Sequence, residues 1–185
     1  MARNSKGFLI IEKIVLTAMM IAMSVVIGIF CKSALNFGAG LFRITFENLP
    51  IILTGILFGP IFGGVAGLLS DVLSYLLSGQ AQPPLILVTI GAISIGVVSG
   101  LISKLLVKKR GSLQIIASGG IAHVIGSMII KPIGLFQFYG WAVLLRIPFY
   151  CVIAPIEIFL LCLLFKNGGF RRMIHNIDRA FKNKS

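Results

Sequence analysis

The sequence predicts an all-α integral membrane protein built as a bundle of about six transmembrane helices. Hydrophobic residues make up 57% of the 185 residues, charged residues make up 12%, and the mean hydropathy is +1.03. A soluble domain carries about 25% charged residues, so this chain has too few polar side chains to cover a surface in water. Residues 48–103 contain a single charged residue, Asp71. That run is several times longer than the ~20 apolar residues that cross a bilayer.

Apolar runs separated by breaks place the six expected spans, and residues 1–185 are expected to form one domain. The spans are expected at residues 14–31, 49–58, from the end of the next turn to about 77, and at 85–107, 113–130 and 146–165. Residues 59–64 (GPIFGG) predict the turn between the short second span and the third. Lys131 and Pro132 are expected to end the fifth span, with a loop reaching about Trp141. Glycines at a spacing of four are expected to let helices pack closely inside the bundle, namely Gly55, Gly59, Gly63 and Gly67, and Gly96 and Gly100.

The distribution of lysine and arginine predicts the orientation in the membrane. Thirteen of the 17 basic residues fall on the side that holds both termini of a six-span bundle, and four fall on the other side. Cytoplasmic loops carry the excess of lysine and arginine, so both termini are expected to be cytoplasmic. The four cations left on the outer side are Lys32, Arg43, Lys131 and Arg146.

Ionisable residues inside a membrane are costly and usually face a cavity or an opposite charge. Asp71 and Tyr75 lie one turn apart in the third span, and Glu47 precedes the second. Together with Arg43, Lys131 and Arg146 they predict an outward-facing pocket, with cations for a carboxylate, a ring for stacking and carboxylates for a donor edge. Glu157 lies eleven residues beyond Arg146, about 16 Å along a helix, which is too deep for that pocket. A structural role is expected for it.

Several kinds of function are disfavoured by what the sequence lacks. It contains no phosphate-binding loop of the type GxxxxGK[ST], no HExxH and no GxSxG, and the carboxylates form no close pair, so no enzyme activity is expected. Each of the three cysteines is isolated, and His123 and His175 stand alone, so no metal and no cofactor are expected. The basic residues fall in short clusters between apolar runs, a pattern that argues against nucleic-acid binding.

The run from Phe42 to Pro50 (FRITFENLP), continuing through Gly55-Ile56-Leu57-Phe58-Gly59-Pro60 to Gly63, Gly67 and Asp71, resembles the substrate-binding S components of energy-coupling factor (ECF) vitamin transporters. The folate-specific members are the most similar. The segment from Leu145 to Leu161 resembles their last helix, and Ala18 and Ala22 resemble the AxxxA motif of their first helix. Size, number of spans and basic cytoplasmic ends agree with this family along the whole chain.

The resemblance implies a multi-pass protein of a prokaryotic plasma membrane that captures a water-soluble vitamin outside the cell. It implies three partner subunits, a transmembrane coupling protein and two ATPases, which would use ATP to drive uptake. Ala18 and Ala22 would then face the coupling protein. Folate is the favoured ligand, but residues 126–139 differ from the folate pattern, so pantothenate, pyridoxine, riboflavin and thiamine stay open. The rival interpretations from the residues are a self-sufficient secondary transporter, a small channel or scaffold, and an intramembrane enzyme.

Overall fold

The computed structural model describes residues 3–34, 36–37, 42–78, 86–105, 112–170 and 172. Within this part of the chain, five helical segments are long and apolar enough to cross a membrane. They are Ile10–Ala34, Pro60–Leu77, Ile86–Leu105, Leu113–Gln137 and Gly140–Lys166. A further apolar helix, Asn48–Phe58, is shorter. The predicted all-helical membrane architecture is therefore confirmed, with one predicted span too short to be counted with the five.

In the described residues, the elements are seven α-helices, a short hairpin of two strands, and a π-helix and a 3₁₀-helix in the last third of the chain. In order they are α1 (Arg3–Ala34), β1 (Asn36–Phe37), β2 (Phe42–Arg43), α2 (Asn48–Phe58), α3 (Pro60–Leu77), α4 (Ile86–Leu105), α5 (Ser112–His123), η1 (Val124–Ile130, the π-helix), α6 (Lys131–Tyr139), η2 (Gly140–Leu145, the 3₁₀-helix) and α7 (Arg146–Lys166). The two strands pair antiparallel, with Asn36 opposite Arg43.

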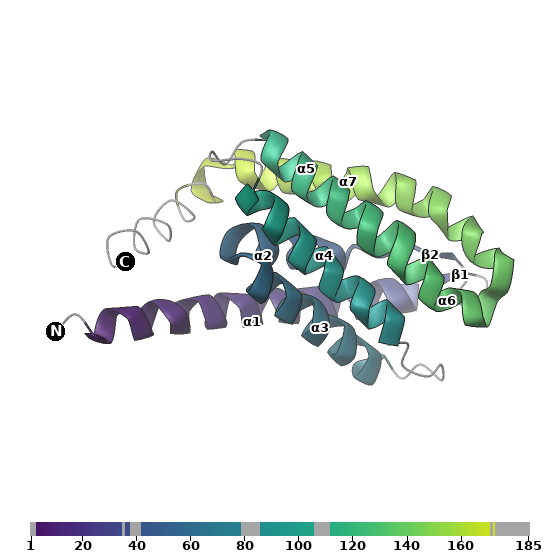
Figure 1. Cartoon of the computed structure of the whole chain (residues 1–185), viewed down its shortest axis with the longest axis horizontal. Helices are drawn as coiled ribbons and strands as arrows, with labels where there is room; N and C mark the ends of the chain where they lie inside the picture. Colours follow the sequence, from purple (N-terminus) through teal and green to yellow (C-terminus); the bar gives the residue numbers. More distant parts are fainter. Residues whose placement is uncertain are drawn as a thin grey trace.

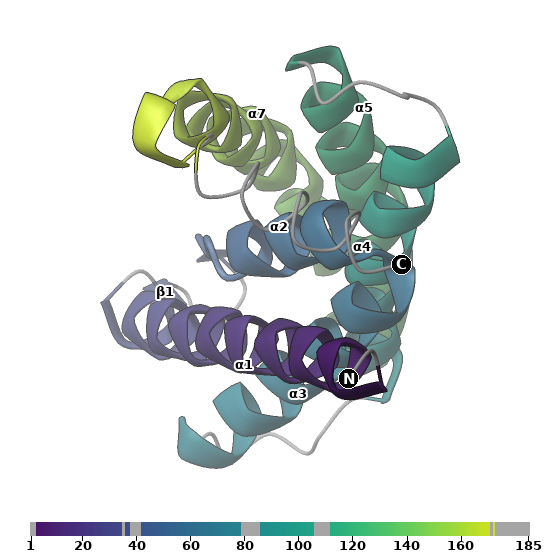
Figure 2. The ribbon, with the colours of Figure 1, turned by 90° about the vertical axis from the view of Figure 1, so that its left-hand side faces the viewer.

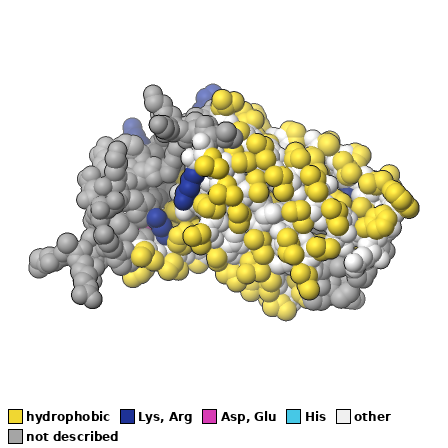
Figure 3. Space-filling view, viewed as in Figure 1, with side chains coloured by type: hydrophobic (Ala, Val, Ile, Leu, Met, Phe, Trp, Pro, Cys, Tyr) yellow, Lys and Arg dark blue, Asp and Glu magenta, His cyan; other side chains and the backbone are white. Residues whose placement is uncertain are grey.

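The bundle has two distinct ends. Helix α1 begins and helix α7 ends at the same end, whereas β1, β2 and α6 lie at the opposite end (Figure 1). Most of the lysine and arginine side chains visible in Figure 3 gather at the end where α1 begins, and hydrophobic side chains cover the rest of that face. The cations visible on this face thus gather at the end that holds the start of α1 and the end of α7, and the assignment of that end to the cytoplasm stays a prediction.

Helix α2 is short because it lies inside the bundle. It packs against α1, α3, α4, α5 and α7, and Figure 2 shows it between α1 and α7. Eight of its residues are buried, and a helix that is apolar all round is typical of such a position. Ile51, Ile52 and Leu53 are at most 2% exposed and form the centre of the core. Large hydrophobic side chains on the other helices face outward, as expected for contact with lipid.

Glycines bring α2, α3 and α4 into close contact, as predicted. A Cβ at Gly63 would collide with the carbonyl oxygen of Gly96, and a Cβ at Gly67 would collide with that of Ala92. Gly59 has a positive φ of 96°, which a larger residue rarely adopts, and it separates α2 from α3 just before Pro60. The glycine spacing in the sequence therefore reflects backbone contacts inside the bundle.

The predicted end of the fifth span at Lys131 and Pro132 is wrong. The helix continues through both residues, and the apolar segment runs from Leu113 to Gln137. Pro132 is accommodated because it lies in the first turn of α6, directly after the π-helix η1. The wider π-helical turn keeps the ring of Pro132 away from the preceding carbonyl group, with which it would collide in a regular α-helix. The expected loop up to Trp141 is instead the end of α6 followed by the 3₁₀-helix η2.

Candidate functional site

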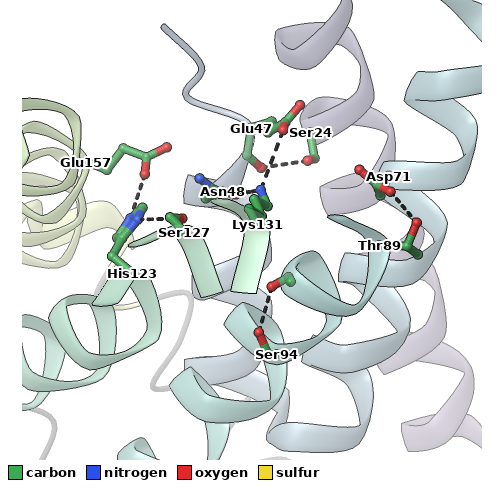
Figure 4. A network of polar contacts seen from close by, with 11 residues as sticks. Ser24, Glu47, Asn48, Asp71, Thr89, Ser94, His123, Ser127, Lys131 and Glu157 are labelled. Atoms are coloured by element: carbon green, nitrogen blue, oxygen red, sulfur yellow. Dashed lines mark hydrogen bonds and ion pairs between the residues drawn. The ribbon is translucent and has the colours of Figure 1, made fainter. Parts of the chain in front are cut away.

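Among the described residues, Figure 4 shows three sets of polar side chains that contact one another inside the bundle. One set surrounds the amine of Lys131, one joins Asp71 to Thr89, and one joins His123 to Ser127 and Glu157. Each set connects different helices, namely the start of α2 with α6, α3 with α4, and α5 with α7. Because polar groups in a bilayer must find partners within the protein, these sets mark the positions where the fold tolerates them.

The Lys131 set joins three parts of the chain. Lys131 is 5% exposed, and its Nζ donates to Asn48 Oδ1 at 3.1 Å. The same nitrogen lies 3.8 Å from Glu47 Oε1. The hydroxyl of Ser24, on α1, donates to the backbone oxygen of Glu47 at 2.7 Å. The structure therefore brings two predicted site residues, Glu47 and Lys131, into one ion pair at the start of α2.

Two glycines leave the space that this ion pair occupies. A Cβ at Gly28 of α1 would lie 2.8 Å from Glu47 Oε2, and a Cβ at Gly91 of α4 would lie 2.6 Å from Lys131 Cγ. Both distances are shorter than the 3.5–4.0 Å of ordinary carbon contacts. The Lys131 side chain therefore lies against the surface of α4 at Gly91, and its amine reaches the start of α2.

Asp71 is partly buried on α3, and its Oδ2 accepts a hydrogen bond from the hydroxyl of Thr89 on α4 at 2.7 Å. Tyr75 lies one turn further along α3 and is also partly buried. The carboxylate is thus held between two helices that pack closely at their glycines. The assignment of Asp71 and Tyr75 to the ligand site stays a prediction.

Arg146 begins α7 and is 9% exposed. Its Cζ lies 5.0 Å from the ring centroid of Tyr139, a cation–π contact with the end of α6. The strand β2, which contains Arg43, packs against α7. The side chain of Arg43 lies outside the described part of the structure, so only the strand is placed. The elements that contain Arg43, Lys131 and Arg146 all lie at the end of the bundle opposite the start of α1 (Figure 1).

The third polar set is one that the sequence analysis missed. His123 and Glu157 are 1% and 0% exposed, and His123 Nε2 lies 2.6 Å from Glu157 Oε2. His123 Nδ1 lies 3.3 Å from Ser127 Oγ. The pair joins the end of α5 to the middle of α7 (Figure 4). The sequence does place His123 and Glu157 within the last two expected spans. Because an ionisable residue in a membrane usually needs a partner, their pairing could have been suggested from that placement.

Ala18 and Ala22, the predicted partner-facing residues, are exposed on α1. They lie among exposed apolar side chains of the same helix, such as Val15 and Met19. Their surface is thus available to another helix or to lipid. Contact with a coupling protein stays a prediction.

Comparisons with known proteins place this architecture in a family. The profile described as "ECF transporter, substrate-specific component" matches residues 12–175. A solved structure titled "Crystal structure of FolT bound with folic acid" is similar to this chain with a TM-score of 0.65 and 23% sequence identity, covering 84% of this chain and 93% of the other. A search of curated protein sequences gave no match. The family is a transport component and not a class of enzymes.

The family match covers most of the chain and includes every helix from α2 to α7. The similar solved structure has the same fold over nearly its whole length. The apolar helices agree with both findings, since a substrate-specific component of this kind is a multi-pass membrane protein. The chain belongs to the family of substrate-specific components of ECF transporters.

Proposed function

We propose that this chain captures folate, or a closely related anionic vitamin, on the outer face of a prokaryotic cell membrane and passes it to a partner complex for ATP-driven uptake. The observation that carries the proposal is the buried cation Lys131, held at the end of the bundle away from the start of α1. A buried ammonium is retained at a cost that an anionic ligand would offset.

The chemistry of the described residues fits folate in two respects. Lys131 has three N–H donors and directs one of them to Asn48 at 3.1 Å, which leaves capacity for a carboxylate of the glutamate tail. Arg146, whose guanidinium contacts the ring of Tyr139, supplies a second cation at the same end of the bundle. Arg43, on the neighbouring strand β2, is proposed as a third. Cations in this number suit a ligand that carries more than one negative charge.

Carboxylates are proposed to recognise the other end of the ligand. A carboxylate can accept two hydrogen bonds from the donor edge of a pterin ring, and Glu47 and Asp71 are the candidates. Tyr75, one turn from Asp71, would contact the flat face of the ring. Both carboxylates already have partners, Lys131 and Thr89. Ligand binding would therefore exchange or extend contacts that exist in the structure.

The remaining part of the proposal concerns the partners. A transmembrane coupling protein would pack along α1 at Ala18 and Ala22, where small side chains leave a shallow groove, and two ATPase subunits would supply ATP hydrolysis. The chain itself would bind no cofactor. Support comes from membership of the ECF family and from the exposure of both alanines on α1.

Ligand identification tests the function directly. The protein is purified in mild detergent, and small molecules that co-purify are released and identified by mass spectrometry. Binding is then measured for folate, pantothenate, pyridoxine, riboflavin and thiamine under the same conditions. The proposal predicts the tightest binding for folate. Tightest binding of thiamine, which is a cation, would contradict it, as would uptake by the chain alone driven by an ion gradient.

A further inference from the structure

The fifth membrane helix changes its hydrogen-bonding pattern beside the proposed ligand site. Residues Val124–Ile130 form a π-helix between α5 and α6. At its end the N–H of Lys131 donates to the carbonyl oxygen of Gly126, five residues earlier instead of four. Such π-helical turns are rare, occur mostly as single turns inside α-helices, and are frequent at functional sites.

The sequence supplies a reason for the π-helix at this position. In a regular α-helix the ring of Pro132 would collide with the carbonyl group of Met128, four residues earlier, and Pro132 has no N–H to donate. A wider turn before Pro132 relieves that collision. Gly126 allows the widened turn to approach α4, since a Cβ there would collide with Ile95 Cγ1 and lie 2.8 Å from the carbonyl oxygen of Gly91.

The π-helix determines which face of the helix Lys131 occupies. An α-helix advances about 100° per residue, so Lys131 would lie about 80° around the helix from His123, eight residues earlier. A π-helical turn accommodates one additional residue, and the two side chains then differ by about 20°, as residues seven apart do in an α-helix. Both side chains therefore face the interior of the bundle.

Two contacts fix this rotation. His123 is held by Glu157 of α7, with 2.6 Å between Nε2 and Oε2, and Lys131 is held by Asn48 of α2 at 3.1 Å. An uninterrupted α-helix over the same residues would keep one of these contacts and turn the other side chain away by about 100°. The π-helix thus makes the two contacts compatible.

We propose that Pro132, through the π-helical turn before it, is a positioning residue that sets the rotation of Lys131 and thereby its ability to bind an anionic ligand. The part that concerns the ligand rests on the function proposed above. The part that concerns rotation does not, because it follows from the contacts of His123 and Lys131 alone. The two parts therefore need separate measurements.

Rotation is measured by cross-linking in protein whose native cysteines have been replaced. Asn48→Cys and Lys131→Cys are introduced together and treated with a short bifunctional thiol reagent. We expect efficient cross-linking when Pro132 is present and a loss of at least about fivefold in yield with Pro132→Ala, because the regular α-helix turns position 131 away. The matched control is Ile133→Ala, which removes an exposed side chain from the same turn and leaves Pro132 in place.

A compensating deletion gives the decisive variant. Ile129 is 50% exposed within η1, and its deletion together with Pro132→Ala allows a regular α-helix that again directs position 131 toward Asn48. We expect this double variant to recover cross-linking. Unchanged cross-linking in Pro132→Ala would overturn the proposal, and so would a double variant that fails to fold or to cross-link.

Affinity for folate is measured in the same series with Lys131 and Asn48 intact. Pro132→Ala is expected to weaken binding about tenfold or more, as for the loss of a charged hydrogen bond, and the double variant is expected to recover it. If cross-linking follows this pattern while affinity does not change, the rotation is correct and the ligand role of Lys131 is refuted. If affinity falls while cross-linking is unchanged, the positioning role of Pro132 is refuted.

Discussion

Replacing Glu157 with leucine is expected to destabilise the protein by about 1–3 kcal/mol, because the change leaves the buried polar side chain of His123 without its partner. Glu157 is 0% exposed and its Oε2 lies 2.6 Å from His123 Nε2. The leucine would leave His123, which is 1% exposed, with Ser127 as its remaining polar contact. A loss of this size is a large fraction of the 5–15 kcal/mol by which proteins are typically stable.

Two further variants separate the polar contact from the packing. Glu157→Gln keeps the size and a polar group beside the imidazole, so its expected cost is about 1 kcal/mol, as for one hydrogen bond. In the double variant, His123→Leu with Glu157→Leu, no polar side chain of the pair is left alone inside the bundle. Apolar replacement of both members of a buried pair is often neutral, so the double variant is expected to be more stable than Glu157→Leu.

The assay is reversible unfolding in mixed micelles, with the helical signal recorded as the fraction of denaturing detergent is raised. The free energies of the wild type, Glu157→Leu, His123→Leu and the double variant give the coupling between the two side chains. A coupling free energy below about 0.5 kcal/mol would contradict this prediction, because it would mean that the contact between His123 and Glu157 contributes little to the stability of the folded state.

Three further predictions concern the ligand site and the partner surface. Gly91→Ala places a methyl group 2.6 Å from Lys131 Cγ and is expected to displace the lysine side chain, which lowers the affinity for folate about tenfold. An unchanged affinity would contradict a ligand role for Lys131 at this position. Asp71→Asn keeps the size and removes the charge, so affinity is expected to fall with little change in melting temperature; normal binding with a much lower melting temperature would indicate a structural role beside Thr89. Ala18→Trp is expected to abolish ATP-driven uptake in reconstituted vesicles and to preserve affinity in detergent, and loss of both or of neither would contradict the partner role.

Much of the fold could be predicted from the sequence because each helix boundary has a local cause. The third span was expected to end at about residue 77, and the helix Pro60–Leu77 does. The expected turn over residues 59–64 is wrong beyond Gly59, because Pro60 already begins the helix. The second was expected at 49–58 and the helix is Asn48–Phe58. Its short length was visible in the sequence, but its position at the centre of the bundle was not, because that depends on packing against five other helices.

The fifth helix was mispredicted because a local rule was applied without its context. Lysine followed by proline usually marks the end of an apolar helix. Here the preceding turn widens into a π-helix and the lysine finds Asn48 and Glu47 inside the bundle. Neither partner is near Lys131 in the sequence, so only the folded arrangement shows why the helix can continue.

Only part of the candidate site could be predicted from the sequence. Cations and carboxylates at unusual depths could be recognised one by one, which gave Glu47, Asp71, Lys131 and Arg146. Their pairing could not be predicted, and Asn48 and the contact of His123 with Glu157 were missed. Pairing depends on the rotation of each helix, and a π-helical turn changes that rotation by about 100°.

Titration of the purified protein with folate, followed by fluorescence, is the most direct test of the central claim that Lys131 captures the anionic part of a folate-like ligand. Three proteins are compared: the wild type, Lys131→Gln, and Lys104→Gln as the matched control, which makes the same change at an exposed residue near the end of α4. We expect saturable binding by the wild type and the control, and affinity reduced about tenfold or more in Lys131→Gln. Equal affinity in all three proteins, or no saturable binding of folate by the wild type, would contradict it.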